Sequence, residues 1–590
     1  MMINRRFRLG CVVVGLGIAA WTGTRSSHPA DSAPADVPHA GRAAFRAGDF
    51  PRAQVLCEEE LLQHRRQPAP ARLKTAQLLQ NLAVVQLQTG ALEAARKNAA
   101  EALDLRIAEL GNDHPDVATT LNNLGAIEYA VADFEAAEQH LRRAAEIRSA
   151  TLDAHDPAVA QTLDNLGCLL TATGRHAEAE TVLREALAIR TAHNDDPVGL
   201  ATTTNNLAAL HLDRCDPDAA ELARQAAALA DKAFADDHPA RMVVLGNTAR
   251  SQQRLAAASA DFDRAITLAT KANAVETPAY AHLLNKIVNY HVAMQDFLPA
   301  ASVAERALTI CHKVFGDRHP ATALALNNLG IMAFVGGDPR NAEKLIRESL
   351  AINERVLGAE HPAVAENIAN LAQIAQQVGA TDQAELLWKR AAAIFEKLGG
   401  ADDPRCVPIA SMLADGAAAR GDAETAERYY RQALKIASRR LGDDHPYTAV
   451  ALNALGALYA RIKRPREAEP LLEQSLAIVD RVYGQDHPYA AVALTNLAAV
   501  AAAQGKFKES RQICERAVRV HDEVYGRLNP RSIDCRLRLA DILEQLEDLD
   551  GAKRLRDEAE ADRVRSGAAE PGRDGKPNTT RLGRLRNAVA

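Results

Sequence analysis

The sequence predicts an all-α fold, a solenoid of stacked antiparallel helix pairs. Proline recurs along most of the chain, and the last six intervals are each 42 residues long; the prolines are at positions 115, 157, 197, 239, 278, 320, 362, 404, 446, 488 and 530. A period in this range is typical of repeated supersecondary units. Apolar residues make up 47% of the chain and aromatic residues only 4%, so the helices must pack through small side chains. We expect about 12 repeats over residues 41–562.

Residues 1–40 differ from the rest of the chain. Arg5, Arg6 and Arg8 precede an uncharged stretch at residues 9–23, and a Pro/Ala-rich linker follows. This order is typical of a secretory signal. The uncharged stretch is shorter than the ~20 apolar residues that span a bilayer. We therefore expect an exported protein, periplasmic or extracellular, with either a cleaved signal peptide or an uncleaved signal anchor at residues 9–23.

The other end of the chain and the overall charge exclude some kinds of partner. Residues 563–590 combine arginine and lysine with glycine and proline, which predicts a disordered basic tail. The formal net charge is -6, with no basic stripe, so we expect no nucleic-acid partner. The eight cysteines include no C-x-x-C pair, so the sequence indicates neither a disulfide framework nor a zinc site.

Residues 110–150 show how one repeat is built. Gly111 supplies the left-handed conformation of a helix C-terminal cap, and Pro115 opens the next helix at its first position. Two apolar runs at helical spacing follow, one on each side of Asp133: Val117, Leu121, Leu124 and Ile127, then Phe134, Ala137, Leu141, Ala144 and Ile147. Two helices joined by a short turn cannot bury their apolar faces alone, so each pair must stack on its neighbours.

The residue before each proline is expected to cap the helix that the proline opens. Histidine occupies this position in six repeats, as His114, His238, His319, His361, His445 and His487; the other five hold Asp156, Asp196, Thr277, Asp403 and Asn529. The five non-histidine residues all come from the set that caps helix N-termini, so histidine must fill the same requirement. Imidazoles placed one per repeat cannot all lie about 2 Å from one ion, so we predict no metal site.

Short strings within the repeats resemble a known family. Leu121–Gly125 and Leu326–Gly330 both read LNNLG, and turns such as Gly442–Pro446 read GDDHP. These strings resemble tetratricopeptide repeats, and the 42-residue length with the His-Pro turn resembles the kinesin-light-chain type. The resemblance implies a right-handed superhelix in which the first helix of each pair lines a concave groove. Kinesin light chains begin with a heptad coiled coil that binds the motor; residues 1–40 lack one, so motor association is not implied.

One polar position recurs in the first helix of each pair, eight or nine residues after the proline. It holds Asn123, Asn165, Asn206, Asn247, Lys286, Asn328, Asn370 and Asn496, with Asn81 in the corresponding place of an earlier pair, whereas Met412, Ala454 and Arg538 occupy it elsewhere. Asparagine costs roughly 0.6 kcal/mol relative to alanine inside a helix, so a compensating interaction is expected. An amide both donates to and accepts from a peptide backbone. In tetratricopeptide proteins this position contacts ligand peptides, so the resemblance implies a peptide-binding groove here. The alternative, that each amide bonds a neighbouring helix and stiffens the stack, stays open.

No catalytic motif accompanies the repeats. The chain lacks a G-x-x-x-x-G-K-[ST] phosphate loop, a G-x-S-x-G elbow and an H-E-x-x-H pair. We therefore expect a non-enzymatic protein-protein interaction scaffold, without cofactor, that binds partner peptide segments in its groove. The alternative is an accessory or regulatory subunit that presents substrates to, or assembles, a separate enzyme complex. Membrane contact is expected only through the N-terminal apolar segment.

The repeat spacing is irregular in one place. The interval from 239 to 278 is 39 residues, the nearby interval from 157 to 197 is 40, and the Leu-Gly pair is displaced to Leu245-Gly246. An irregular unit weakens coupling between neighbours in a stacked array. We predict a bend or hinge near residues 236–290.

Overall fold

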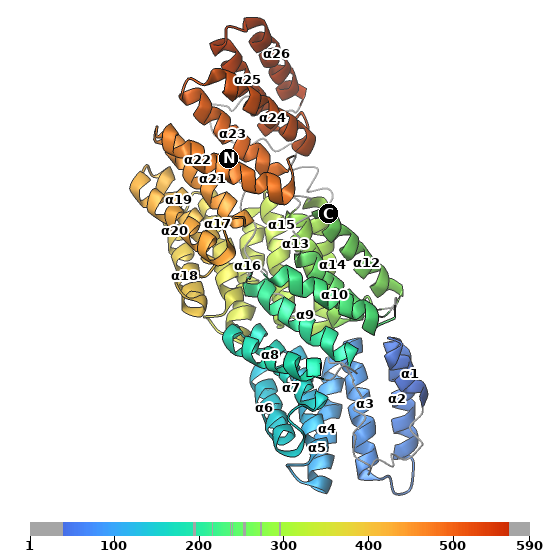
Figure 1. Cartoon of the computed structure of the whole chain (residues 1–590). Helices are drawn as coiled ribbons and strands as arrows, with labels where there is room; N and C mark the ends of the chain where they lie inside the picture. Colours follow the sequence, from blue (N-terminus) through green and yellow to red (C-terminus); the bar gives the residue numbers. More distant parts are fainter. Residues whose placement is uncertain are drawn as a thin grey trace. The chain divides into compact units, whose positions relative to one another are not determined.

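The computed structural model describes residues 39–565 except 193–195, 215, 217, 236–237, 239, 252–254, 272–273, 294–296 and 486. Within these residues the chain forms 26 helices and no strand (Figure 1). The helices are α1 His39–Arg46, α2 Phe50–Arg65, α3 Arg72–Thr89, α4 Leu92–Leu110, α5 Pro115–Ala130, α6 Phe134–Thr151, α7 Pro157–Ala172, α8 His176–Ala192, α9 Pro197–Arg214, α10 Ala219–Ala233, α11 Ala240–Ser251, α12 Leu255–Lys271, α13 Pro278–Ala293, α14 Phe297–Phe315, α15 Pro320–Val335, α16 Pro339–Leu357, α17 Pro362–Gln377, α18 Thr381–Gly399, α19 Cys406–Ala419, α20 Ala423–Leu441, α21 Pro446–Arg461, α22 Pro465–Tyr483, α23 Pro488–Ala503, α24 Phe507–Tyr525, α25 Pro530–Gln545 and α26 Leu549–Arg565.

Consecutive helices pack as pairs, and each pair packs on the next, which confirms the predicted all-α solenoid. Helices α5, α7, α9, α13, α15, α17, α21, α23 and α25 all begin at a proline, as the sequence predicts. The repeat at residue 404 departs from this rule, because α19 begins only at Cys406. There the Asp403 carboxylate accepts a hydrogen bond from the backbone N–H of Arg405 at 2.8 Å and pairs with the Arg405 guanidinium at 2.6 Å. This local turn places Pro404 before the helix.

Two kinds of turn repeat along the array, and both depend on left-handed backbone. The second helix of a pair ends at a glycine with positive φ at positions 111, 316, 358, 400, 442, 484 and 526. The turn inside a pair also needs positive φ, supplied by glycine at 48, 90, 174, 337, 379, 421 and 505. Three repeats place another residue there: Ala132 (φ 63°), Lys463 (φ 61°) and Glu547 (φ 63°). A side chain in this conformation is strained by its Cβ.

Glycine also sets the spacing between the two helices of a pair. A Cβ built on Gly125 would lie 2.7 Å from Cγ of Leu141, and one on Gly456 would lie 2.7 Å from Cγ of Leu472. The missing side chain therefore lets a leucine of the second helix pack directly on the first.

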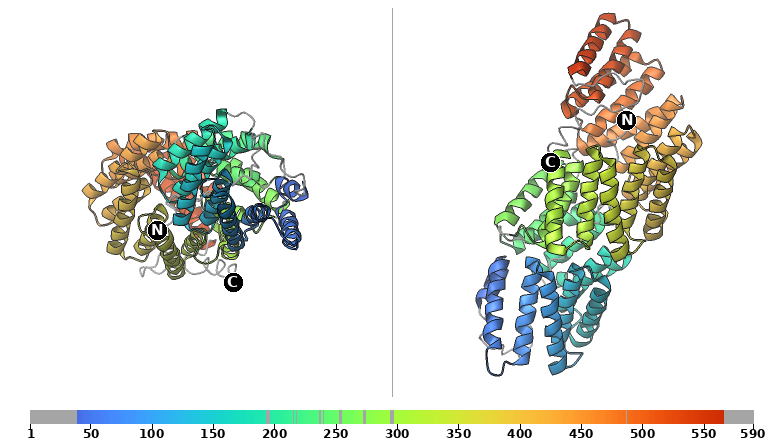
Figure 2. Two further views of the ribbon diagram at one scale, coloured as in Figure 1. Left: turned by 90° about the horizontal axis from the view of Figure 1, so that it is seen from below. Right: turned by 180° about the vertical axis from the view of Figure 1, so that it is seen from behind.

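The chain divides into two compact units. Among the described residues, the N-terminal unit comprises residues 39–334 and 339–371, and the C-terminal unit comprises residues 335–338 and 372–565. Figure 2 shows the N-terminal helices from two further directions. Core clusters follow the array; one of them runs from Met242 to Ala325. That cluster crosses the predicted hinge at residues 236–290, which stays a prediction.

The predicted terminal segments lie almost wholly outside the described residues. The signal peptide or anchor at residues 1–40 precedes α1, apart from His39 and Ala40. Helix α26 extends to Arg565, three residues into the predicted tail, and the rest of the tail is not described. Among the described helices, none has the length and apolar character needed to cross a membrane.

Candidate functional site

The residue before each proline caps a helix, as predicted. All six histidines accept a backbone N–H at Nδ1, over distances of 3.0 to 3.2 Å; the donors are the N–H groups of Asp116, Ala240, Ala321, Ala363, Tyr447 and Tyr489. The other five repeats use a side-chain oxygen, on Asp156, Asp196, Thr277, Asp403 and Asn529. A neutral imidazole that accepts at Nδ1 carries its proton at Nε2. Each capping histidine therefore keeps one donor for another contact.

In the N-terminal unit that donor connects distant parts of the array. His361 Nε2 lies 2.7 Å from the carbonyl oxygen of Ala172, which precedes it by 189 residues, or four and a half repeats. Two glycines show that such contacts recur at nearly the same sequence separation. A Cβ built on Gly90 would lie 3.5 Å from Pro278 Cδ, and a Cβ built on Gly174 would lie 3.2 Å from Pro362 Cδ. The ends of α3 and α7 therefore contact the starts of α13 and α17. The solenoid within this unit coils back onto itself.

The recurring asparagines form hydrogen bonds from one repeat to the next. Asn328 Nδ2 donates to Asn285 Oδ1 at 3.0 Å. The same bond, 2.9 to 3.0 Å long, joins Asn165 to Asn122, Asn247 to Asn205, Asn370 to Asn327 and Asn496 to Asn453. We call this series the asparagine ladder. The donors are the asparagines predicted from the sequence; the acceptors stand one place earlier in the preceding repeat.

The remaining predicted residues have other contacts. Lys286 Nζ donates to Asn247 Oδ1 at 2.5 Å, and Asn81 Oδ1 accepts from Gln77 Nε2 at 2.9 Å. Asn123 Oδ1 accepts from the neighbouring Asn122 at 3.2 Å. Asn206 is buried, at 6% exposure. The structure thus gives most of the predicted side chains a structural bond, while peptide binding by them stays a prediction.

Where the ladder lacks a donor, the chain also lacks an amide acceptor. Ala369 stands at the acceptor position of the repeat before Met412, and Ser411 stands at the acceptor position before Ala454. The Ser411 hydroxyl is satisfied within its own helix, since it donates to the carbonyl oxygen of Val407 at 3.0 Å. Burying an amide oxygen without a hydrogen-bond donor costs free energy. If the ladder bond is structural, its donor and its acceptor must therefore be replaced together, as they are in these repeats.

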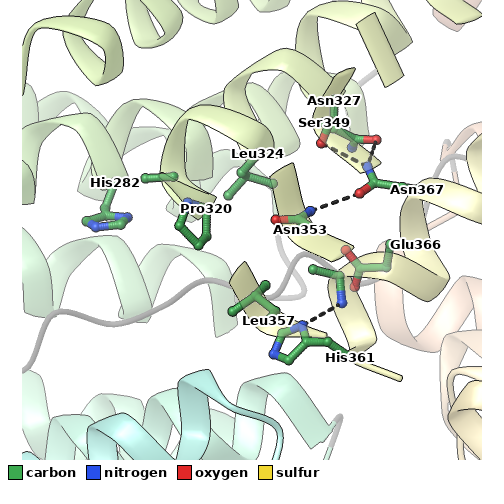
Figure 3. A pocket seen from close by; sticks show the side chains of 12 residues that line it. His282, Pro320, Leu324, Asn327, Ser349, Asn353, Leu357, His361, Glu366 and Asn367 are labelled. Carbon is green, nitrogen blue, oxygen red and sulfur yellow. Dashed lines mark hydrogen bonds between the residues drawn. The ribbon is translucent and has the colours of Figure 1, made fainter. Parts of the chain in front are cut away.

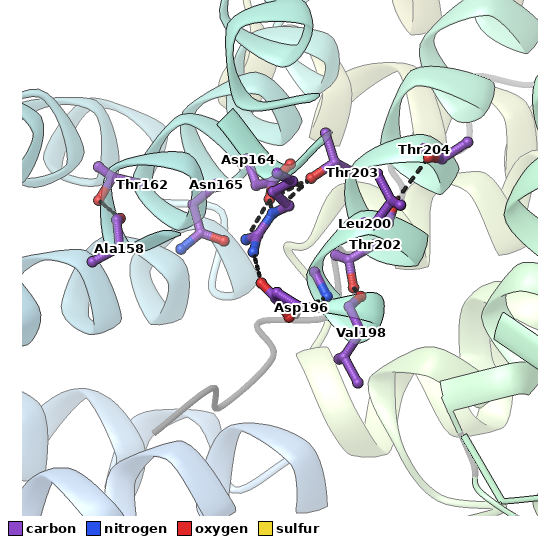
Figure 4. Close-up of polar contacts among 12 residues, drawn as sticks. Ala158, Thr162, Asp164, Asn165, Asp196, Val198, Leu200, Thr202, Thr203 and Thr204 are labelled. Atoms are coloured by element: carbon purple, nitrogen blue, oxygen red, sulfur yellow. Dashed lines mark hydrogen bonds and ion pairs between the residues drawn. The ribbon is translucent and has the colours of Figure 1, made fainter. Parts of the chain in front are cut away.

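Buried arginines connect the first repeats beneath the ladder. Arg190 pairs with the Asp164 carboxylate at 3.0 Å, donates to Thr203 Oγ1 at 3.0 Å and also contacts Asp196 (Figure 4). Burial raises the pKa of Asp164 despite this partner. Arg148 has hydroxyl and carbonyl partners instead, and burial lowers its pKa to about 10. These side chains hold neighbouring repeats together and line no described pocket.

One group of side chains has the composition of a metal site. His211, Asp216 and Asp218 bring their ligand atoms within 4.8 Å of one another. However, His211 already faces Asp218 at 2.5 Å and Glu180 at 3.0 Å, and the Arg214 guanidinium lies 2.9 Å from Asp216 and 3.1 Å from Glu180. The Arg214 guanidinium therefore already pairs with two of the carboxylates around His211.

A pocket opens in the N-terminal unit where α13, α15, α16 and α17 meet. Its cavity volume is about 30 Å³, and the pocket is partly open to solvent. Its lining comprises His282, Pro320, Ala321, Leu324, Asn327, Ser349, Asn353, Leu357, His361, Ala363, Glu366 and Asn367. His282 lies on one side and the amides of Asn353 and Asn367 on the other, with Leu324 and Leu357 between them (Figure 3). We call this the α15–α17 pocket.

Some polar atoms of this pocket form no hydrogen bond with the protein. Asn353 donates to Asn367 Oδ1 at 2.9 Å, but its own Oδ1 is buried without a partner. Both ring nitrogens of His282 are also buried and unpartnered. Burial lowers the pKa of His282 to about 3, with smaller contributions from His319 and Lys286. The ring is therefore neutral near pH 7, with one donor and one acceptor available.

Comparison with known proteins identifies the repeats. A family model described as tetratricopeptide repeat matches residues 89–150, 116–192, 325–397, 407–481, 466–512 and 489–561, and a second model of the same description matches residues 281–321. No curated protein matches the sequence.

Solved structures with similar folds cover a minority of the chain. The crystal structure of BtubC (BKLC) from P. vanneervenii is 20% identical over 41% of this chain and 95% of that one, with a TM-score of 0.35. A putative kinesin light chain from Podosopora anserina, with nearly identical TPR-like repeats, is 24% identical over 35% of this chain and 97% of its own, with a TM-score of 0.30.

Proposed function

Since the chain belongs to the tetratricopeptide repeat family, we propose that it is a non-enzymatic scaffold that binds peptide segments of partner proteins. Repeats of this kind expose long surfaces built from equivalent side chains, and such surfaces suit extended ligands. The family membership supports protein binding in general. The binding surface must be argued from this chain's own residues.

The observation that carries the proposal is the unused hydrogen-bonding capacity of the α15–α17 pocket. Asn353 Oδ1 offers an acceptor and His282 offers a donor and an acceptor, beside the apolar side chains of Leu324 and Leu357. Buried polar atoms of native proteins are normally paired, so unpaired ones need an explanation. A peptide presents N–H and C=O groups along its backbone and apolar side chains beside them. We propose that such a segment docks over this pocket and inserts one of its groups into it.

We also propose that the ladder side of the first helices forms part of the peptide-binding groove. The ladder uses the amide nitrogen of Asn328, while the Asn328 Oδ1 atom is buried and accepts no hydrogen bond. The ladder donors Asn165 and Asn496 are only half-buried, so a bound peptide can reach their amides. The ladder then fixes the amide orientation that the ligand meets, so the structural and binding roles are compatible.

The N-terminal segment is the basis for a proposal about the compartment in which the protein acts. We propose export to the periplasm or the extracellular space, on the basis of the basic, apolar and Pro/Ala-rich order of residues 1–40. Determining the N-terminus of the mature protein in its native cell tests this. A new N-terminus after residue 23 supports a cleaved signal, and an intact Met1 in a membrane fraction supports an anchor. An intact Met1 in the cytosolic fraction contradicts export.

The binding proposal is tested by selecting linear peptides from a random displayed library against the immobilised full chain. We expect a few sequence classes to enrich, and the synthetic peptides to bind in solution with dissociation constants in the micromolar range. Enrichment no greater than on a bare support, or selected peptides that fail to bind in solution, would contradict the proposal.

A further inference from the structure

Two cysteines on adjacent helices of the C-terminal unit lie side by side. Cys514 in α24 is 1% exposed and Cys535 in α25 is 2% exposed, and both belong to one core cluster. The Cys514 thiol donates to the backbone carbonyl oxygen of Cys535 at 3.7 Å, which places its sulfur beside that residue. The sequence alone did not indicate this pair, because 21 residues separate the two cysteines and no C-x-x-C motif marks them.

Cys514 occupies a position that other repeats give to a large side chain. Its equivalents Leu141, Leu183, Ile346 and Leu472 pack against a glycine of the preceding helix. In this repeat the glycine is replaced by Ala498 and the leucine by Cys514. Alanine, valine and isoleucine side chains fill most of the same cluster. A second cysteine directly opposite is therefore not explained by packing volume alone.

The two thiols differ from the other buried cysteines of the chain. Burial raises the pKa of Cys311 and of Cys406 to about 12, which keeps both protonated and unreactive. At the pair the direction differs, because the neighbouring Cys514 thiol lowers the pKa of Cys535, while the same neighbour and burial raise the pKa of Cys514. Cys535 is therefore the sulfur of the pair that loses its proton more readily, and a thiolate is the form that attacks a disulfide.

We propose that Cys514 and Cys535 form a disulfide that joins α24 to α25 when the chain meets an oxidising compartment. The reaction is thiol–disulfide exchange with a small or protein disulfide. The Cys535 thiolate attacks one sulfur of that oxidant, forms a mixed disulfide and releases the other sulfur as a thiolate. Cys514 then loses its proton and attacks Cys535 Sγ, which releases the second thiolate. Overall, one oxidant disulfide takes two electrons and the two cysteine protons, and becomes two thiols.

Access to the buried pair comes from opening of the array at α25. The pair α25–α26 packs on the preceding repeats through α24, so its separation exposes both sulfurs without unfolding the rest. Once formed, the disulfide opposes the same opening. The disulfide closes the loop between Cys514 and Cys535. From the closure entropy of a loop of this length, the equilibrium constant for opening at α25 should fall by about 100-fold.

The experiment uses the full chain, purified reduced and equilibrated with a mixture of oxidised and reduced glutathione at an oxidising ratio. After acid quenching, free thiols are alkylated under denaturing conditions and the peptides are mapped by mass spectrometry. We expect a cross-linked peptide pair that contains Cys514 and Cys535, with the other described cysteines alkylated. This disulfide map is made on the wild-type chain, so the result does not depend on whether a variant folds.

Variants and hydrogen exchange complete the test. We expect oxidation to slow amide exchange in α25 about 100-fold in the wild type and in Cys406→Ser, but not in Cys514→Ser or Cys535→Ser. Recovery of both thiols in alkylated form from the oxidised wild type would overturn the proposal. So would a cross-link that joins either cysteine to a different partner.

Discussion

Asn328 donates its amide N–H to Oδ1 of Asn285, one repeat earlier, over 3.0 Å, and both side chains are at most 1% exposed. Replacing Asn328 by methionine leaves the Asn285 oxygen buried without this donor. We expect Asn328→Met to lower the free energy of unfolding by about 2 kcal/mol. Denaturant unfolding of the full chain, followed by circular dichroism, measures the change.

The chain supplies the control for this substitution. Ala369 and Met412 stand at the acceptor and donor positions of a later pair of repeats, so Asn285→Ala with Asn328→Met copies an apolar combination that the protein already contains. We expect the double variant to be more stable than the sum of the two single changes predicts, by about 1 kcal/mol. Additive effects would contradict a structural ladder.

The three non-glycine residues with positive φ predict stabilising substitutions. Ala132, Lys463 and Glu547 occupy the turn position that glycine fills in seven other repeats. Removing the Cβ relieves the strain, although glycine also gives the unfolded chain more freedom. We expect Lys463→Gly to raise the free energy of unfolding by about 0.5 kcal/mol, as measured by chemical denaturation. Lys463→Ala, which keeps the Cβ, should leave it near the wild-type value; equal gains in both variants would exclude backbone strain.

The close contact at Gly456 predicts the opposite result. An added Cβ would lie 2.7 Å from Cγ of Leu472 and 3.3 Å from the carbonyl oxygen of Ala468. We expect Gly456→Ala to lower the unfolding free energy by about 2 kcal/mol through overpacking. Gly456→Ala with Leu472→Cys copies the Ala498 and Cys514 combination and should recover part of the loss. A double variant less stable than Gly456→Ala would show that the leucine is not the obstacle.

Buried histidines make the N-terminal unit sensitive to acid. Burial lowers the pKa of both His282 and His319 to about 3, from an ordinary value of 6.5. Between pH 6.5 and 3 the unfolded chain binds protons that the folded chain does not, so stability is highest above pH 6.5 and falls as the pH drops. The slope should approach ~1.4 kcal/mol per pH unit for each histidine. Urea unfolding at a series of pH values measures it.

A matched pair of variants isolates the His319 contribution. Asn529 caps a helix at the same position in another repeat, so His319→Asn keeps the cap and removes the titrating ring. We expect a shallower loss of stability below pH 6.5 in His319→Asn. His114→Asn, at a capping histidine whose side chain is 40% exposed, is the control. An identical pH dependence in His319→Asn and wild type would contradict the assignment.

The repeat fold was predictable because its determinants are local. Pro115 and the residue before it fix a helix start, Gly111 fixes a helix end, and the apolar spacing between them needs no knowledge of distant residues. Repetition then showed that histidine, aspartate and asparagine meet the same requirement. The eleven observed caps confirm that comparison.

The candidate site was less predictable because it depends on register between repeats. The sequence singled out Asn328 but not its acceptor Asn285, since only the packed array shows that the two amides meet. His361 and Ala172 are 189 residues apart, and no local pattern reports that they touch. The α15–α17 pocket is lined by residues of four helices, so the pattern of a single repeat could not locate it either.

The central claim, that this protein binds peptide segments through the α15–α17 pocket, is tested most directly by titrating a library-selected peptide into three full-length proteins. Ala363 lines the pocket, and the equivalent residues Tyr447 and Tyr489 show that tyrosine is accepted at this repeat position. Ala363→Tyr should fill the pocket and weaken binding about tenfold or more, with helical content and thermal unfolding unchanged. Asp116→Tyr, at the same position of a repeat outside the pocket, should bind as the wild type does. Equal affinity of all three proteins would contradict the claim.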